Sequence, residues 1–322
     1  MLDLFAQDPP PGGFEVLVAD GLSDDGTREI LTRLSTQHAA LRVIENPGVI
    51  VAIGLNAAIK EARGDIIIRM DVHSSYARDY LCQCVAVLQQ TGADNVGGPW
   101  IARGSASLSR TIAAAFQNPL VGGAARGHDP RYEGPVDTVY LGCWRRSAFD
   151  RFGSFDEELV RNQDDEHNLR IIRKGGRVWQ SPKIRSWYYP RNSLSSLFRQ
   201  YAQYGYWKVR VIQKHRLPAS IRHLVPGAFV GLVLVCVALA PMWSWARAGL
   251  GLLIAAYMAV NVMGSIASAA HSEWRLLPLL PAVIAGYQIG YGFGFLCGVW
   301  DFVVLRRGAS DWFVQLTRGA IR

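Results

Sequence analysis

The feature that most constrains this chain is a set of three long stretches near its C-terminal end that contain no Asp, Glu, Lys or Arg. They run from Leu224 to Ala246, from Ala248 to Ser272 and from Leu276 to Trp300. Each exceeds the ~20 residues that an α-helix needs to cross the apolar core of a bilayer. A soluble protein of 322 residues has little polar structure with which to cover three such helices. We therefore expect membrane segments within residues 223–305 and a basic tail at residues 306–322.

The third stretch differs from the other two because glycines interrupt it. These are Gly286, Gly290, Gly292, Gly294 and Gly298. Glycines suit close helix packing and also a re-entrant hairpin, so the sequence leaves both arrangements open. Three full crossings would leave the arginines of the tail outside the cytoplasm, against the positive-inside rule, so the hairpin stays an open alternative.

A strongly basic tract precedes the first apolar stretch. Residues 170–222 hold 13 Lys or Arg and no acid. This asymmetry predicts a multi-pass protein of the plasma (inner) membrane with its N-terminal domain in the cytoplasm. Within residues 187–222, apolar side chains recur at helical spacing between Leu194 and Ile212. The segment is therefore expected to form an amphipathic helix, lying either on the membrane surface or against the protein's own domain.

The first 186 residues alternate β-prone runs with helical patterns, which predicts an α/β domain. The runs Phe14–Ala19 and Ile66–Met70 are typical of strands covered on both faces, and they end in Asp20 and Asp71. Ligands bind beyond the carboxyl ends of strands in open α/β sheets, so both acids are expected at one crevice.

The second strand leads into the sequence Asp71-Val72-His73. A spacing of two in extended chain puts both polar side chains on one face. A carboxylate and an imidazole can bind a divalent cation that bridges a diphosphate. Taken alone, the pair is more typical of a surface turn.

The order of several short motifs resembles the family 2 glycosyltransferases with the GT-A fold, in particular the membrane-attached enzymes of succinoglycan-type exopolysaccharide synthesis. The motifs are Val18-Ala19-Asp20-Gly21-Leu22-Ser23-Asp24-Asp25-Gly26-Thr27, Asn46-Pro47, Gly54-Leu55-Asn56, Ala62-Arg63-Gly64-Asp65, Asp71-Val72-His73, Gly97-Gly98-Pro99, Gly153-Ser154-Phe155-Asp156-Glu157, Asn162-Gln163-Asp164-Asp165-Glu166 and Tyr188-Tyr189-Pro190-Arg191. The resemblance covers nearly the whole chain.

The resemblance implies a GT-A nucleotide-sugar-binding domain, a Rossmann-like mixed sheet, at residues 1–186. Asp20, Asn56 and Asp71 would bind the nucleotide-sugar donor, with Asp20 at the uracil. Asp71 and His73 would hold a divalent metal, Mn²⁺ or Mg²⁺. His73 stands where the family more often has an Asp, and imidazole suits manganese better than magnesium.

The same resemblance implies that Asp164 is the general base, with Asp165 as the alternate. A helix dipole also stabilises acids in a first turn without any catalytic role. Sugars bind aromatic faces, so Trp144 and Phe155 are candidates for the acceptor site, although core packing explains Phe155 equally well. Arg191 and Arg199 are candidates for donor or lipid phosphates.

The chain departs from the family pattern at its beginning. Family members usually start with a β-strand that contacts the nucleotide, whereas Leu2–Gln7 resembles the helix that follows it. We therefore expect a sheet that lacks its first strand.

The resemblance implies an inverting glycosyltransferase that moves a hexose from a nucleotide sugar, UDP-linked in the family pattern, to a lipid-linked glycan in exopolysaccharide biosynthesis. Two alternatives stay open. One is transfer to polyprenyl phosphate, and the other is a catalytically inactive membrane scaffold. The expected partners are donor, acceptor, membrane lipids and other exopolysaccharide assembly proteins, and no nucleic acid.

Overall fold

The computed structural model describes residues 2–122 and 126–315, which form two compact units. The first unit comprises the residues up to Trp100 together with Asp129–Trp187. The second comprises Ile101–His128 and the chain from Tyr188 onward. The first unit ends close to the expected boundary at residue 186. Residues 101–128, expected in the same domain, belong instead to the helical unit, because α5 (Ser107–Phe116) packs on its membrane helices.

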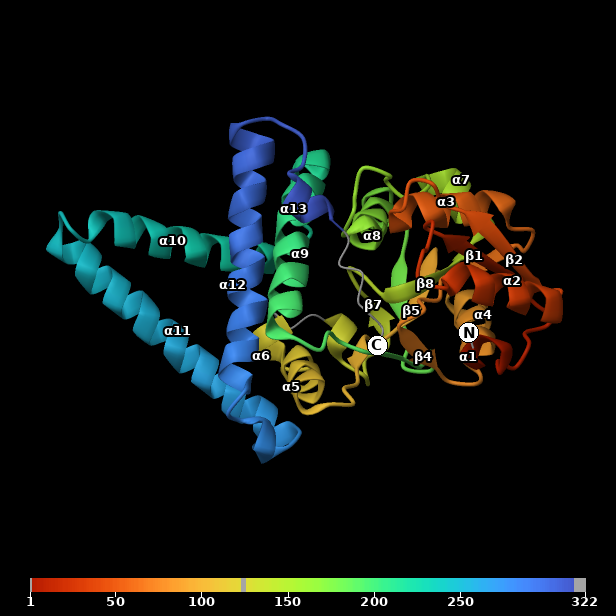
Figure 1. Cartoon of the computed structure of the whole chain (residues 1–322), viewed down its shortest axis with the longest axis horizontal. Coiled ribbons are helices and arrows are strands. Elements are labelled where there is room, and N and C mark those ends of the chain that lie inside the picture. Colours follow the sequence, from red (N-terminus) through yellow and green to blue (C-terminus); the bar gives the residue numbers. More distant parts are fainter. Residues whose placement is uncertain (1, 123–125, 316–322) are drawn as a thin grey trace. The chain divides into compact units, whose positions relative to one another are not determined.

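The first unit contains a parallel pair of strands and a separate mixed sheet of five (Figure 1). The parallel pair is β1 (Val16–Asp20) with β2 (Leu41–Glu45). The sheet has the order β3 (Ile66–Ile68), β8 (Tyr140–Arg145), β5 (Asn95–Gly98), β9 (Val178–Gln180), β7 (Gly134–Pro135). Only β5 and β9 pair in parallel within it. The predicted α/β architecture is thereby confirmed.

Two strand edges of this unit are open. Within residues 2–122 and 126–315, β1 pairs only with β2, and β3 only with β8. The three isoleucines of β3 read as a doubly covered strand in the sequence, yet they are only half-buried.

Helices cover the strands through apolar stripes. In α4 (Tyr80–Thr91), Tyr80, Cys84, Val87 and Leu88 recur on one face and are buried against β3, β5 and β8. The other helices of the unit are α1 (Leu2–Phe5), α2 (Thr27–Gln37), α3 (Val51–Glu61), α7 (Arg146–Phe152) and α8 (Gln163–Arg173). The short strand β4 (Ser74–Tyr76) follows β3 and contacts α1.

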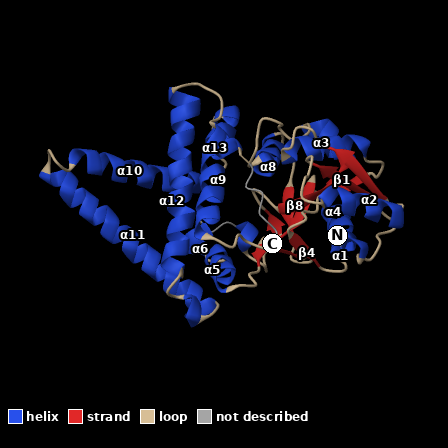
Figure 2. Cartoon of the chain, viewed as in Figure 1, coloured by secondary structure: helices blue, strands red, loops and turns tan. Residues whose placement is uncertain are grey.

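The second unit contains three helices that are long and apolar enough to cross a membrane (Figure 2). The first is Ile221–Leu239, which consists of a short 3₁₀ turn (Ile221–His223) and α10 (Val225–Leu239). The second is α11 (Ser244–His271). The third is Leu280–Val304, which consists of α12 (Leu280–Gly298) and a π-helical turn at Val299–Val304. The first ends earlier than the charge pattern suggested. Pro241 follows it, and proline cannot continue a helix. Residues 244–246 therefore belong to the second helix.

The glycines of the third segment serve helix packing. Helix α12 is continuous from Leu280 to Gly298, so no hairpin opens within it. Helix α9 (Leu194–His215) runs alongside α12 (Figure 1). A Cβ atom on Gly294 would collide with the carbonyl oxygen of Ala202, and one on Gly205 with that of Tyr291. The amphipathic helix therefore packs against the third apolar segment, and its contact with a membrane surface stays a prediction.

An ion pair between a buried acid and an exposed arginine ends the third segment. Asp301, 3% exposed, accepts hydrogen bonds from Arg307 at 2.8 and 3.0 Å and from the Tyr206 hydroxyl of α9 at 2.7 Å. Beyond it, α13 (Asp311–Val314) returns to α9, where the rings of Phe313 and Tyr206 stack at 3.9 Å. Residues 316–322 of the expected basic tail lie outside the described residues.

Candidate active site

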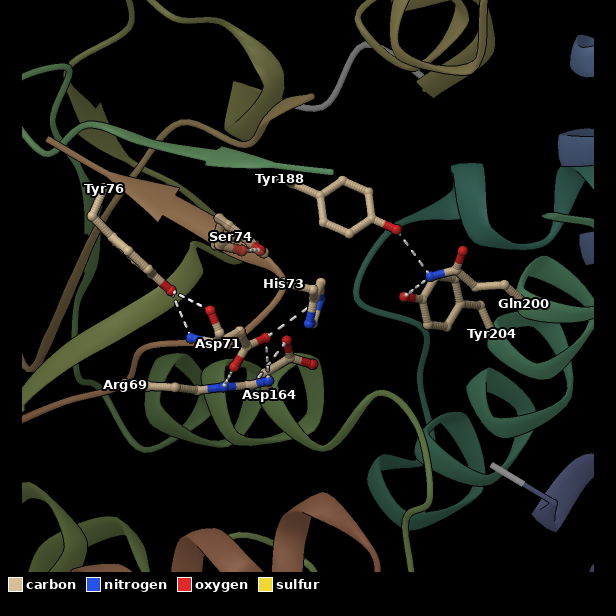
Figure 3. Close-up of polar contacts among 10 residues, drawn as sticks. Arg69, Asp71, His73, Ser74, Tyr76, Asp164, Tyr188, Gln200 and Tyr204 are labelled. Carbon is tan, nitrogen blue, oxygen red and sulfur yellow. Dashed lines mark hydrogen bonds and ion pairs between the residues drawn. The ribbon is translucent and has the colours of Figure 1, made fainter. Parts of the chain in front are cut away.

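An arginine that the sequence analysis did not single out organises the candidate site. Arg69 and Asp71 follow β3 at a spacing of two, so extended chain places them on one side. The Arg69 guanidinium forms a bidentate ion pair with the Asp71 carboxylate (Figure 3). Nε donates to Oδ1 at 2.9 Å and Nη2 donates to Oδ2 at 3.1 Å. Such bidentate pairs fix geometry as well as charge. The sequence signal was the spacing of an arginine two residues before a strand-end acid.

The backbone of Asp71 is fixed by a single hydroxyl group. The Tyr76 hydroxyl accepts a hydrogen bond from the Asp71 amide at 2.6 Å and donates one to the Asp71 carbonyl at 3.0 Å. Both the main chain and the side chain of Asp71 are thus held in place before any ligand arrives.

Asp164 approaches the same arginine from a different element. It lies in the first turn of α8, which follows Asn162 in a left-handed conformation (φ 63°). Its Oδ2 atom is 3.8 Å from Arg69 Nη1, and about a third of its side chain is exposed. The structure therefore brings the predicted donor-binding acid and the predicted base to the two ends of one guanidinium.

The electrostatics of this trio favour its ionised form. Burial alone would raise the pKa of Asp71, but the charge of Arg69, with His73, holds that pKa below its usual range. Burial works against the charge of Arg69, yet Asp71 and Asp164 together raise its pKa above the usual value. Arg69 and Asp71 therefore form a charged pair in this site.

His73 and Asp71 provide two donor atoms for a cation. Nε2 of His73 lies 3.9 Å from Oδ2 of Asp71, so both face the same space. Among residues 2–122 and 126–315, no group of three or more His, Cys, Asp and Glu side chains could hold a metal ion. The donor set thus fits a cation that takes its other ligands from a diphosphate and water, as magnesium sites often do. When bound, the cation would neutralise charge on that diphosphate.

Asp20 lies at the end of β1, as predicted, and its side chain is buried. Its Oδ2 atom accepts a hydrogen bond from the Ser23 amide at 3.1 Å and lies 3.7 Å from Arg28 Nε. The acid thus shapes the turn into α2. Its contact with a nucleotide stays a prediction.

Asn56 has a role other than the expected one. Its side-chain amide donates to the Phe155 carbonyl at 2.9 Å and to Glu157 at 2.8 Å, and its oxygen accepts from the Phe155 amide at 2.9 Å. These bonds use both of its N–H groups. Asn56 therefore fastens the segment at Phe155 to α3, which leaves it no N–H donor for the nucleotide.

The two aromatic residues expected at the acceptor site lie in the core. Trp144 is 1% exposed and Phe155 is 4% exposed, and their rings meet edge-on at 5.9 Å. They pack with Phe149, Phe152 and Ile171. Neither ring presents a face to a sugar, so the acceptor assignment is corrected to core packing.

Arg191 and Arg199 belong to the second unit. Arg199 donates to Gln315 Oε1 at 2.9 Å, and its guanidinium lies 5.6 Å from the ring of Trp312. These contacts tie α9 to the segment after α12. A phosphate-binding role for either arginine stays a prediction.

Comparisons with known proteins agree with this architecture. A family model described as Glycosyl transferase family 2 matches residues 1–153. Succinoglycan biosynthesis protein ExoA of Rhizobium meliloti (strain 1021) is 33% identical over 250 residues, which cover 75% of this chain and 76% of that protein. The Methanococcus voltae dolichyl N-acetyl-alpha-D-glucosaminyl phosphate 3-beta-D-2,3-diacetamido-2,3-dideoxy-beta-D-glucuronosyltransferase is 27% identical over 305 residues, 92% of this chain and 90% of that protein.

Among solved structures, S. aureus TarS 1-349 aligns over 92% of this chain and 85% of that chain, with a TM-score of 0.48 and 17% identity. The family assignment rests on the sequence relatives, and the first of these exceeds 30% identity over three quarters of each protein. With its GT-A-like mixed α/β unit and C-terminal apolar helices, the chain belongs to glycosyl transferase family 2.

Proposed function

We propose that this family 2 glycosyltransferase transfers a hexose from a UDP-linked donor to a lipid-linked glycan with inversion at the anomeric carbon. The observation that carries the proposal is the trio of Asp71, Arg69 and Asp164, which joins a strand-end acid to a helix-borne acid in one cluster. Asp71 lies where a donor diphosphate is expected in α/β sheets. Asp164 is partly exposed and can meet an acceptor from solvent.

The proposed reaction needs one base. Asp164 takes the proton of the acceptor hydroxyl as that oxygen attacks the anomeric carbon. The bond between this carbon and the diphosphate oxygen breaks, and the nucleoside diphosphate leaves with the electron pair. Arg69 lies 3.8 Å from Asp164 and would orient its carboxylate toward the acceptor hydroxyl. Asp71 and His73 would hold the Mn²⁺ or Mg²⁺ ion of the donor complex.

Two findings support an acceptor carried on a lipid. Within residues 2–122 and 126–315, three helices are long and apolar enough to span a membrane. The Methanococcus voltae relative is named for transfer onto a dolichyl-linked sugar phosphate. We place the catalytic unit in the cytoplasm, because 13 basic residues and no acid occupy residues 170–222, before the first span. Contacts with other assembly proteins stay a prediction.

Calorimetry on the full chain in detergent, with UDP and Mn²⁺, tests the donor site. Asp71→Ala should weaken binding at least ~10-fold, because the cation loses its charged ligand. The control is Asp65→Ala, which removes an exposed acid just before the same strand. Unchanged affinity in Asp71→Ala, or no UDP binding by the unaltered chain, would refute the proposed donor site. Transfer of labelled sugar from UDP-hexoses to membrane lipid extracts then identifies the donor.

A further inference from the structure

The Arg69 side chain is nearly buried, and one of its nitrogen atoms is left without a hydrogen-bond acceptor. Its side chain is only 10% exposed, and its Nη1 atom is buried without a hydrogen-bond partner. This atom lies on the side of Asp164, at 3.8 Å, beyond hydrogen-bond distance. A buried N–H group without an acceptor costs free energy, so the resting arrangement leaves one donor unsatisfied.

The Arg69 guanidinium also occupies the position beside Asp71 that a divalent metal ion would otherwise take. Both Asp71 oxygens accept hydrogen bonds from it, so the charge that would attract a divalent ion is already compensated. Hard divalent ions bind through anionic oxygens, and they bind poorly where a fixed positive charge lies within a few ångströms. His73, the second donor atom, adds no negative charge.

A nucleoside diphosphate would make metal binding beside Asp71 favourable. It brings several negative charges and further oxygen ligands for the ion. Its phosphate oxygens can also accept hydrogen bonds from a guanidinium, which is a strong donor to phosphate.

From this geometry we infer that Arg69 acts as an internal counter-ion that keeps divalent metal off Asp71 until a nucleotide diphosphate arrives. The metal then enters as a complex with the nucleotide. The inference rests on the proposed function for the role of Asp71, and it adds an order of binding. Arg69 is a positioning residue in this scheme.

Titration of Mn²⁺ without nucleotide, followed by the electron paramagnetic resonance signal of the free ion, tests the inference on the full-length protein. Arg69→Gln removes the counter-ion and should raise Mn²⁺ affinity ~10-fold or more. Arg69→Lys keeps the positive charge but loses the bidentate hydrogen bonds to Asp71, so an intermediate gain in Mn²⁺ affinity is expected. Arg33→Gln, an exposed arginine of α2, is the charge-matched control and should behave as the unaltered chain.

The double variant Arg69→Gln/Asp71→Asn shows where the additional Mn²⁺ binds. The gain in Mn²⁺ affinity should disappear when the Asp71 carboxylate is removed. A second readout is thermal unfolding. Mn²⁺ alone should stabilise Arg69→Gln and leave the unaltered chain unchanged, a metal rescue that a merely structural arginine would not give. Mn²⁺ affinity equal to that of the unaltered chain in both single variants overturns the inference, and so does a gain that survives Asp71→Asn.

These outcomes are independent of the proposed donor. If the unaltered chain fails to bind UDP, the proposed function fails, while the nucleotide-free titrations still decide the role of Arg69. If UDP binds with Mn²⁺ and the Arg69 variants show no gain, only the counter-ion role is refuted.

Discussion

Three consecutive acids open α8, and the structure gives them different surroundings. Glu166 is buried and paired with Arg170 at 2.7 Å, and Arg170 in turn donates to the carbonyls of Phe152 and Ser154. Asp164 accepts from the Asp165 amide through one oxygen, and its other oxygen lies near Arg69. Glu166 is thus explained by structure, and Asp164 is favoured over Asp165 as the base.

Asp164→Asn should leave UDP affinity unchanged and lower turnover by ~10² to 10⁴, the usual contribution of a positioned base. Single-turnover transfer and calorimetry on the same preparation separate the two effects. Asp165→Asn is the matched control and should be mild. A larger loss of turnover in Asp165→Asn would assign the base to the neighbouring residue.

His167 is a buried base held neutral in the core. Its Nε2–H group donates to the Gly153 carbonyl at 3.0 Å, and its ring stacks on Phe149. Burial, with the charge of Arg170, lowers the pKa of His167 to about 4. In the unfolded chain the imidazole has a pKa of about 6.5. Between these values the unfolded chain binds the extra proton, so stability is full above about pH 6.5 and falls as the pH decreases toward 4.

His167→Gln should therefore reduce the loss of melting temperature between pH 7.5 and pH 5. By pH 5 this proton binding lowers the free energy of unfolding by roughly 2 kcal/mol at most, from about 1.4 kcal/mol per pH unit below 6.5. Differential scanning fluorimetry across this range measures it. An unchanged pH slope would mean that other groups dominate acid unfolding.

At the scale of elements, the contact between α9 and α12 depends on helices approaching without side chains between them. Gly290 and Gly294 face Phe198 and Ala202 of α9 at a spacing of four. This spacing is the small-residue pattern of close helix pairs in membranes. The sequence left open whether these glycines serve close helix packing or a hairpin, because a period of four identifies a packing face and not the helix that occupies it.

Gly294→Ala should destabilise the helical unit, although alanine is the better helix former by about 1 kcal/mol. The added methyl group meets the backbone of Ala202, which cannot move without displacing α9. The control is Gly251→Ala in α11, where the methyl group enters open space and should be neutral or stabilising. Thermal unfolding in detergent compares the two, and equal melting temperatures would contradict the packing.

At the scale of the whole molecule, local pattern predicted the kinds of element but not their grouping. The strand-end acids Asp20 and Asp71 and the three apolar helices were foreseen, because each depends on a short stretch of chain. The sequence did not predict that residues 101–128 belong to the helical unit. The apolar stripe of Ile112, Ala115 and Phe116 is the same whether the helix packs on a sheet or on another helix. The burial of Trp144 was missed for the same reason.

The pair between Asp301 and Arg307 changes how the charges around the third span are counted. Transfer of an ion pair into or across a membrane costs much less than transfer of two separate charges. From Asp301 to Ser310 the chain has two arginines and one acid, so its net charge is +1 and not +2. Because Arg307 is paired with the buried Asp301, an unbroken helix of Leu280–Val304 meets less electrostatic opposition to a full crossing.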